Sequence, residues 1–244
     1  MKPGVPAPSV RHHRVLVWFA GLYALLMLSG CTNTPPPASW QANTLSATET
    51  FTQAYLSGHQ AMSQAALARA RQELSQTGRG DLMARLELTQ CALEVATLAP
   101  TTCPAYERLA IDAQNSEKAY SAFLLGRWQD LRVDDLPKQY RDFFAAASQV
   151  AQTSPTANSA QQGSKLALIA NPLSRLIAAG ILQIRGQLGE VDVQAAVDTA
   201  SLQGWRRALL AWLGLQLKSA QAQGEQDKAA QIQRRIALVL QQPS

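Results

Sequence analysis

The chain has 244 residues, of which 47% are hydrophobic and 16% are charged, so it is long and apolar enough to bury one sizeable core. Lys2, Arg11 and Arg14 precede Cys31 and no acidic residue does, which leaves 19 basic against 17 acidic residues for the rest, a net charge of +2. This small surplus argues against nucleic-acid binding, which needs clustered Lys and Arg. Only His59 follows Cys31, so a histidine-rich metal site is excluded.

The first thirty residues have the order of a secretory signal. Residues 1–14 are basic and contain no acid, and residues 15–30 form one uninterrupted apolar stretch. A transmembrane helix needs roughly 20 apolar residues, and the sixteen residues 15–30 are short for that purpose. We therefore predict that residues 1–30 direct export and are removed.

The apolar stretch ends in Leu28-Ser29-Gly30-Cys31, which resembles the lipobox of bacterial lipoproteins. The resemblance covers the leader only. It implies cleavage between Gly30 and Cys31, a diacylglyceryl thioether on Cys31 and acylation of its new amino group. Several acyl chains hold a protein on a membrane almost permanently, because each buried methylene adds about 0.8 kcal/mol. The alternative is an ordinary signal peptide in which Cys31 is incidental.

The residue after the cysteine is Thr32 rather than an aspartate. In the Gram-negative members of the lipoprotein class this implies transfer to the outer membrane, and we expect its periplasmic face. The inner membrane and the cell surface are the alternatives. Residues 31–43, with three consecutive prolines, are expected to form a lipidated, extended tether.

Residues 44–244 are expected to form a single all-α domain, since apolar residues recur every three or four positions and alternating runs are absent. Ser46 and Glu49 have the spacing of a capping box, which predicts a first helix that runs toward Leu74 with a break at Gly58. Asp81 is expected to cap the next helix, which Pro100 ends.

Cys91 and Cys103 are the only other cysteines. Export would place them in an oxidising compartment, where an even pair is normally bridged, so we predict a disulfide between them. The alternative, a redox or nucleophilic thiol, has no C-x-x-C spacing to support it.

The remaining helices are expected in the following order. Pro104 begins a short helix, residues 116–131 form another, and Asp134 or Asp135 caps a helix that Pro137 opens. Residues 152–164 are polar and are expected to form an exposed loop. Further helices start at Asn171-Pro172, with an apolar face that runs from Leu173 through Ile184 to Leu188, and at Asp192.

The last segment, residues 205–240, is expected to form a helical hairpin. It resembles a tetratricopeptide unit in having Gly224 at the turn and Ala229 five residues later, and it departs from that pattern at Leu217. No second copy follows at a period of 34 residues. We therefore expect stacked antiparallel helix hairpins, of the tetratricopeptide or α-solenoid kind, or an irregular helical bundle.

Four groups of residues are candidate sites, each with a structural alternative. The paired acids can act as general acid and base or as helix caps. The arginine pairs can bind a partner or form a solvated edge. The tryptophans can line a ligand groove or fill the core, and the lone histidine is expected at the surface. These groups are Asp134 and Asp135; Arg206, Arg207, Arg234 and Arg235; Trp128, Trp205 and Trp212; and His59.

The sequence has no nucleophile elbow, zinc-protease, Walker or dinucleotide-binding motif. We therefore expect no catalytic residues, metal or cofactor, and a scaffold or assembly accessory that binds an envelope protein. The alternative is a carrier of lipid or another small ligand in an apolar cavity between helices. A third hypothesis is a peptidoglycan-modifying enzyme, although Ser116-Glu117 reverses the glutamate-serine order seen in lytic transglycosylases. An enzyme would need a glutamate buried in a cleft with a raised pKa; the candidates are Glu73, Glu87, Glu94, Glu107 and Glu117.

Overall fold

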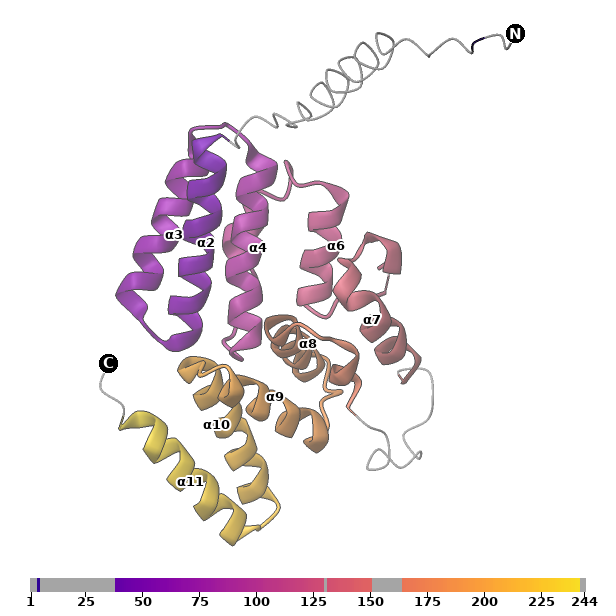
Figure 1. Ribbon diagram of the computed structural model, residues 1–244. Coiled ribbons are helices and arrows are strands. Elements are labelled where there is room, and N and C mark those ends of the chain that lie inside the picture. The colour runs from indigo at the N-terminus through magenta and orange to yellow at the C-terminus, as the bar shows by residue number, and fades with distance from the viewer. Residues whose placement is uncertain (1–3, 5–37, 130, 151–163, 242–244) are drawn as a thin grey trace. The chain divides into compact units, whose positions relative to one another are not determined.

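The computed structural model describes residues 4, 38–129, 131–150 and 164–241. Over these residues the chain forms ten α-helices, two short 3-10 helices and no strand (Figure 1), which confirms the all-α class. Within the same residues no helix is both long and apolar enough to span a bilayer. The chain divides into two units, residues 1–38 and 39–244, and the second is described below. The predicted signal cleavage and lipidation at Gly30 and Cys31 fall outside the described residues, as does the polar loop 152–164 apart from Ser164.

Helices of 10 to 19 residues make up most of the body. In chain order the elements are α2 (Ser39–Ser57), α3 (Gln60–Ser75), α4 (Gly80–Ala96), α5 (Pro104–Glu107), α6 (Asn115–Leu124), the 3-10 helix η1 (Val133–Asp135), α7 (Lys138–Val150), the 3-10 helix η3 (Lys165–Leu168), α8 (Pro172–Ile184), α9 (Glu190–Leu202), α10 (Arg206–Ala222) and α11 (Gln226–Leu240).

The first hairpin, α2 with α3, begins earlier than expected. Helix α2 starts at Ser39, so residues 39–43 belong to the folded body and not to the predicted tether 31–43. Trp40 packs against the core, which explains the additional helical turn. Ser46 lies inside the helix and does not cap it. The break at Gly58 is confirmed: this residue has φ +88°, a conformation that glycine adopts without the strain a side chain would bring.

Helix α6 ends seven residues before the predicted boundary at residue 131. Gly126, with φ +69°, lets the backbone N–H of Arg127 turn back to the carbonyl of Ala122, at 2.9 Å. Trp128 then folds back onto Phe123, with its indole N–H donating to the Phe123 carbonyl at 3.2 Å. The two rings are stacked with centroids 5.7 Å apart.

Of the predicted helix caps, Asn171 is confirmed, whereas Asp81 and the pair Asp134 and Asp135 are not caps. Asn171 accepts a hydrogen bond from the backbone N–H of Ser174. Asp192, expected at the start of its helix, lies in the first turn of α9 and accepts a hydrogen bond from the backbone N–H of the N-cap Gly189. Asp81 instead lies in the first turn of α4, after the N-cap Arg79. Asp134 and Asp135 lie in η1, and Leu136 and Pro137 separate them from the start of α7 at Lys138.

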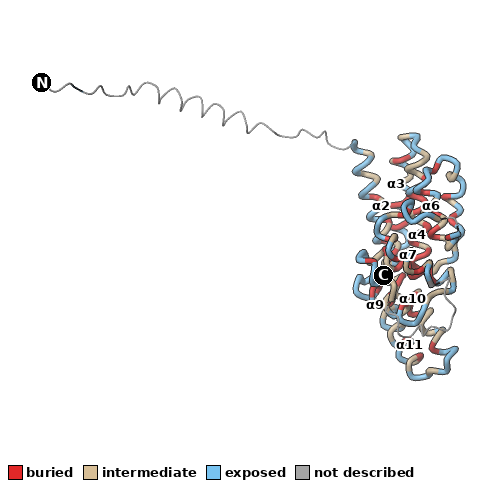
Figure 2. Tube along the Cα trace, turned by 90° about the vertical axis from the view of Figure 1, so that its right-hand side faces the viewer, coloured by how far each residue is buried: buried red, intermediate tan, exposed pale blue. Residues whose placement is uncertain are grey.

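Helix α8 packs against α4 and α10 packs against α2, while α9 packs against α8 and α10, and α11 packs against α10 (Figure 1). The indole N–H of Trp212 donates to the Ala96 carbonyl at 3.0 Å, and that of Trp205 donates to Gln53 Oε1 at 3.2 Å. Buried residues follow the faces that the helices turn toward each other (Figure 2). The contacts of Trp205 and of α10 therefore join the C-terminal helices to α2 and α4 in one body.

Candidate functional site

The predicted disulfide between Cys91 and Cys103 is present in the structure. Cys91 lies on α4 and Cys103 directly precedes α5, with their Cα atoms 5.3 Å apart. Both residues are buried. Thr101 Oγ1 accepts a hydrogen bond from the Cys103 backbone N–H at 3.0 Å. The bridge therefore ties the segment 98–103, which lies outside the helices, to α4.

Helix α4 ends at a residue with an uncommon backbone conformation. Leu98 has φ +56°, and the N–H of Ala99 turns back to the Glu94 carbonyl at 2.9 Å. This is the hydrogen-bond pattern of a Schellman motif, in which glycine usually holds the left-handed position. Leu98 instead brings a half-buried apolar side chain to this point.

Helices α4 and α8 approach closely at Gly180. A Cβ atom added there would overlap the Val95 carbonyl oxygen and lie 2.8 Å from Val95 Cγ1. The approach brings Ile184, at the end of α8, opposite the loop that follows α4. Ile184 was expected on the buried face of its helix, but it is 50% exposed.

These elements enclose a groove of about 1200 Å³, which we call the apolar groove. The loop closed by the disulfide forms one wall, and α8 with the end of α6 forms the opposite wall. Its lining residues are Glu94, Val95, Leu98, Ala99, Pro100, Thr101, Thr102, Pro104, Glu107, Leu125, Arg127, Gly180, Gln183, Ile184 and Leu215. The groove opens to solvent, because Glu107, Arg127 and Ile184 on it are each about half exposed or more.

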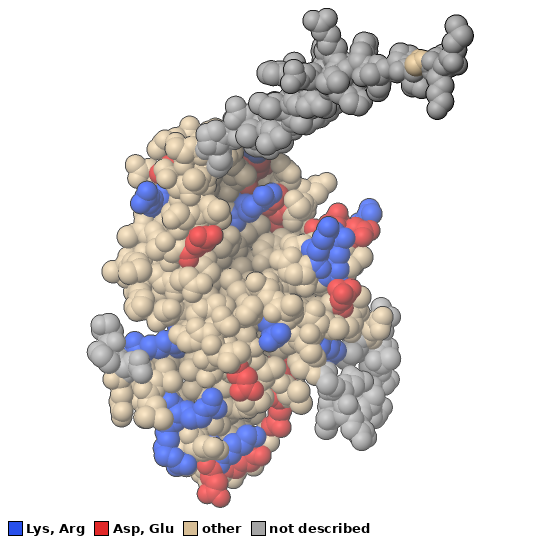
Figure 3. All heavy atoms as spheres, viewed as in Figure 1, with Lys and Arg blue, Asp and Glu red and all other residues tan. Residues whose placement is uncertain are grey.

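A second hollow of about 920 Å³, which we call the basic cleft, shares Glu107 and Arg127 with the apolar groove. Its lining residues are Tyr106, Glu107, Ala110, Lys118, Ala119, Ser121, Ala122, Gly126, Arg127, Trp128, Gln129, Leu131, Arg132, Asp135 and Arg185. The guanidinium carbon of Arg185 lies 4.0 Å from the centre of the Trp128 ring. Charged side chains gather near the α6–α7 connection and toward α11 on the face in Figure 3, with wide uncharged areas between.

The predicted arginine pairs lie on α10 and α11. Arg206 donates to the Val239 carbonyl at 3.1 Å, and Arg207 donates to Gln60 Oε1 at 2.6 Å. Arg207 also lies over the Tyr55 ring, 4.3 Å from its centre. Arg206 and Arg207 thus join α10 to neighbouring helices, whereas Arg234 is exposed and Arg235 half-buried. A partner-binding role for the four arginines stays a prediction.

The remaining candidates follow their structural alternatives. Trp128, Trp205 and Trp212 are 7%, 6% and 0% exposed, and each indole N–H has a hydrogen-bond acceptor, so they belong to the core. His59 is exposed at the N-terminus of α3. Asp134 and Asp135 are exposed, and Asp135 lies at the edge of the basic cleft. No group of three or more His, Cys, Asp or Glu suited to hold a metal ion occurs among the described residues.

Two of the five candidate glutamates are buried, and both are paired with arginine. Glu87 accepts two hydrogen bonds from Arg71, at 2.7 and 2.6 Å. Glu117 accepts from Arg85 at 2.7 Å and from the Ser116 hydroxyl at 3.1 Å. Burial alone would raise the pKa of Glu117, but these bonds outweigh it and hold the pKa below its ordinary value. Glu117 is therefore suited to an ion pair and not to proton donation.

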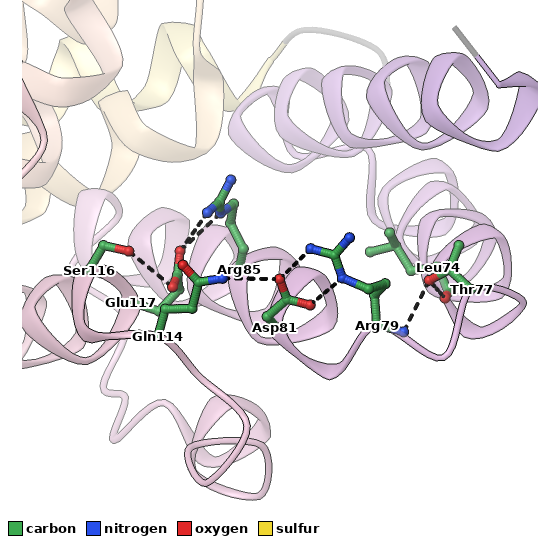
Figure 4. Close-up of polar contacts among 8 residues, drawn as sticks. All are labelled: Leu74, Thr77, Arg79, Asp81, Arg85, Gln114, Ser116 and Glu117. Atoms are coloured by element: carbon green, nitrogen blue, oxygen red, sulfur yellow. Dashed lines mark hydrogen bonds and ion pairs between the residues drawn. The ribbon is translucent and has the colours of Figure 1, made fainter.

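Figure 4 shows that Glu117 lies near a second polar contact of α4. Arg79 holds Asp81 with two hydrogen bonds of 2.8 and 2.6 Å, and Gln114 reaches the same carboxylate at 3.4 Å. The hydrogen bonds from Arg79 lower the pKa of Asp81 to about 2. These contacts connect the start of α6 to α4.

The other three candidate glutamates are less buried. Glu73 accepts a hydrogen bond from Asn43 at 3.1 Å and Glu94 one from Gln90 at 2.9 Å, and both are half-buried. Glu107 is 48% exposed, with Arg127 at 3.5 Å. Glu94 and Glu107 lie on the apolar groove, a placement that no pattern in the sequence indicates. Gly180, inside the mostly apolar helix α8, was the one local signal in the sequence that α8 packs closely against another helix at the groove.

No family model, curated protein or solved structure matches this chain.

Proposed function

We propose that the protein is a lipid-anchored, non-catalytic protein of the bacterial cell envelope whose helical body holds a protein partner in the apolar groove. The observation that carries the proposal is the wall of that groove, a loop tied to α4 by a buried disulfide. A fixed apolar wall open to solvent suits a partner's side chains, because binding then orders little of the receptor.

The disulfide also supports the proposed location. Such bridges persist in secreted and periplasmic proteins and are rare in the cytosol. A leader that ends in a lipobox-like sequence supports the same location. With Thr32 after the cysteine, the periplasmic face of the outer membrane is the proposed site of anchoring. There the protein would act as a scaffold or assembly accessory built from stacked helix hairpins.

The carrier of lipid or another small ligand is the second candidate. A volume of about 1200 Å³ lies slightly above the range of about 300–1,000 Å³ typical of ligand sites, so the groove has room for such a ligand. A carried apolar molecule, however, has most of its surface enclosed, whereas Ile184 in the wall is 50% exposed. The exposure of the wall favours a protein segment over an enclosed ligand.

Site-specific crosslinking tests the proposed function. A photo-reactive phenylalanine analogue replaces Ile184, which lines the groove, in the lipidated protein in its own cells. The matched control replaces Leu202, an 86% exposed apolar residue that does not line the groove. We expect one discrete protein adduct from position 184 and none from position 202. No adduct at 184, or the same adducts at both positions, would contradict the proposal.

Mass spectrometry of the native product tests the anchoring. We expect a chain that begins at residue 31 and carries fatty acid, and a Cys31→Ser variant that carries none. A native product that keeps residues 1–30, or lacks fatty acid at Cys31, would contradict lipidation while leaving the groove to be judged by crosslinking.

A further inference from the structure

The apolar groove and the basic cleft form a continuous surface. They share Glu107 and Arg127, and the neighbours Ile184 and Arg185 at the end of α8 lie one in each. A single extended ligand can therefore occupy both. The chemistry changes along this path, from an apolar wall at one end to a charged one at the other.

Cations predominate in the basic cleft. Among the residues that the structure describes, four basic side chains line it, against the two carboxylates Glu107 and Asp135. The basic residues are Lys118, Arg127, Arg132 and Arg185. The contact between Arg127 and Glu107 is long, at 3.5 Å, and both side chains are largely exposed, so it neutralises little.

Arg185 lies in the wall of the cleft with neutral hydrogen-bond partners. Its Nη1 donates to the Gly126 carbonyl at 2.8 Å and its Nε donates to Gln187 Oε1 at 3.1 Å. Partial burial lowers the pKa of its guanidinium. An anion at this point would therefore offset the loss of hydration of this cation.

Ser121 supplies an independent observation. Its residue is 2% exposed, and its hydroxyl has no hydrogen-bond partner among the described residues, yet it lines the same cleft. Buried polar groups are normally paired, and an unpaired one needs an explanation. A ligand carboxylate would accept a hydrogen bond from this hydroxyl.

We infer that the partner segment is an extended acidic peptide, with apolar side chains in the groove beside Leu98 and carboxylates in the cleft near Arg185 and Ser121. This inference rests on the proposed function and adds the chemistry and direction of the partner. Glu94 lines the apolar groove but not the basic cleft, and it repels carboxylates in the groove, so the acidic residues of the peptide belong in the cleft.

The loop 99–102 favours a peptide over an anionic lipid. This segment lies outside the helices and borders the groove, where its backbone groups can pair with those of an extended chain. An acyl chain cannot form hydrogen bonds with backbone groups, and it would need apolar walls that are closed to solvent.

Selection from a display library of random twelve-residue peptides tests the inference on the mature lipoprotein in detergent. We expect the selected peptides to be enriched in Asp and Glu on one side of an apolar pair. The double variant K118E/R132E reverses two exposed cleft charges and should weaken these peptides by about tenfold. The control K138E/K218E makes the same charge change at exposed positions outside both hollows and should leave affinity unchanged.

Ser121→Ala provides a second variant that should fold normally. Removing an unpaired buried hydroxyl should leave stability unchanged or raised, while peptide affinity falls by roughly two- to tenfold. Unchanged affinity in both S121A and K118E/R132E would overturn the inference.

The outcomes separate the inference from the proposed function. Selected peptides that lack acidic enrichment but lose binding in Leu98→Asn would overturn the acidic partner and leave the groove function standing. Selection of no peptide would contradict both. Binding of phosphatidylglycerol vesicles that K118E/R132E abolishes, without acidic peptides, would assign the cleft to lipid headgroups and overturn the inference.

Discussion

At the scale of single residues, Gly180 sets the distance between α4 and α8. Because a Cβ atom would overlap the Val95 carbonyl, Gly180→Ala should force the helices apart and lower stability by about 1–3 kcal/mol. A Cβ atom added at Gly214 in α10 would have no neighbour within 4 Å, so Gly214→Ala should raise the stability of the protein by up to about 1 kcal/mol. Urea unfolding of both variants measures the difference, and equal effects would show that the close approach is not as described.

Glu117 makes stability depend on acid pH. Its pKa is lower in the folded than in the unfolded chain, so its contribution is complete above the ordinary value near 4.5 and is lost as pH falls through the folded pKa. The contribution of Asp81 is lost at lower pH, near its pKa of about 2. We expect the urea midpoint to fall below pH 4.5 and the fall to be smaller in Glu117→Gln. An identical pH profile in that variant would contradict the Arg85 contact.

The backbone at Leu98 is the other residue with a testable role. Asparagine tolerates the left-handed conformation better than leucine, so Leu98→Asn should relieve backbone strain. The same change removes apolar surface that is half-buried, which lowers stability. We expect a net change in stability within about 1 kcal/mol and a loss of the crosslink at position 184. Retained crosslinking would show that Leu98 does not contact the partner.

At the scale of elements, the disulfide fixes the wall of the apolar groove. Cys91→Ser with Cys103→Ser should lower stability by about 3 kcal/mol, the entropic value for a loop of this size. Thermal unfolding followed by circular dichroism, with and without reductant, measures it. Reductant should lower the midpoint of the wild type to that of the double variant and leave the variant unchanged.

The sequence predicted which segments are helical better than it predicted their ends. The recurrence of apolar residues identified the helices, and Gly58 and Asn171 marked boundaries through local chemistry that the structure retains. The start of α2 was missed because Trp40 packs against residues distant in sequence. The end of α6 was missed because Leu131 and Trp128 continue the apolar spacing although Gly126 turns the chain. The tetratricopeptide resemblance of α10 and α11 stays a prediction.

At the scale of the whole molecule, the contacts of α10 with α2 and with the end of α4 predict cooperative unfolding. Trp212 is fully buried, and Trp212→Ala should lower stability by about 3–5 kcal/mol. Because Trp212 binds the end of α4, helical signal and tryptophan fluorescence should be lost in one transition. Met62→Ala, at a 55% exposed position, should change stability by less than about 0.5 kcal/mol. Two separate transitions would show that α10 and α11 unfold alone.

The groove itself was beyond prediction from the sequence. It joins Val95 to Gly180 and Leu98 to Leu215, pairs separated by long stretches of chain, and no local pattern identifies such neighbours. The basic residues of the cleft are likewise single and scattered, and only the fold gathers them. Composition could exclude some functions, but a surface assembled from five segments needs the three-dimensional structure.

The hydrogen bond from Trp212 to Ala96 spans 116 residues. The end of α4 therefore stays incomplete during synthesis until α10 has been made. Contacts of such high sequence separation slow folding, since the chain entropy is lost before the contact forms. For the export proposed above, this delay would be an advantage, because a chain that folds late is still unfolded when it crosses the membrane.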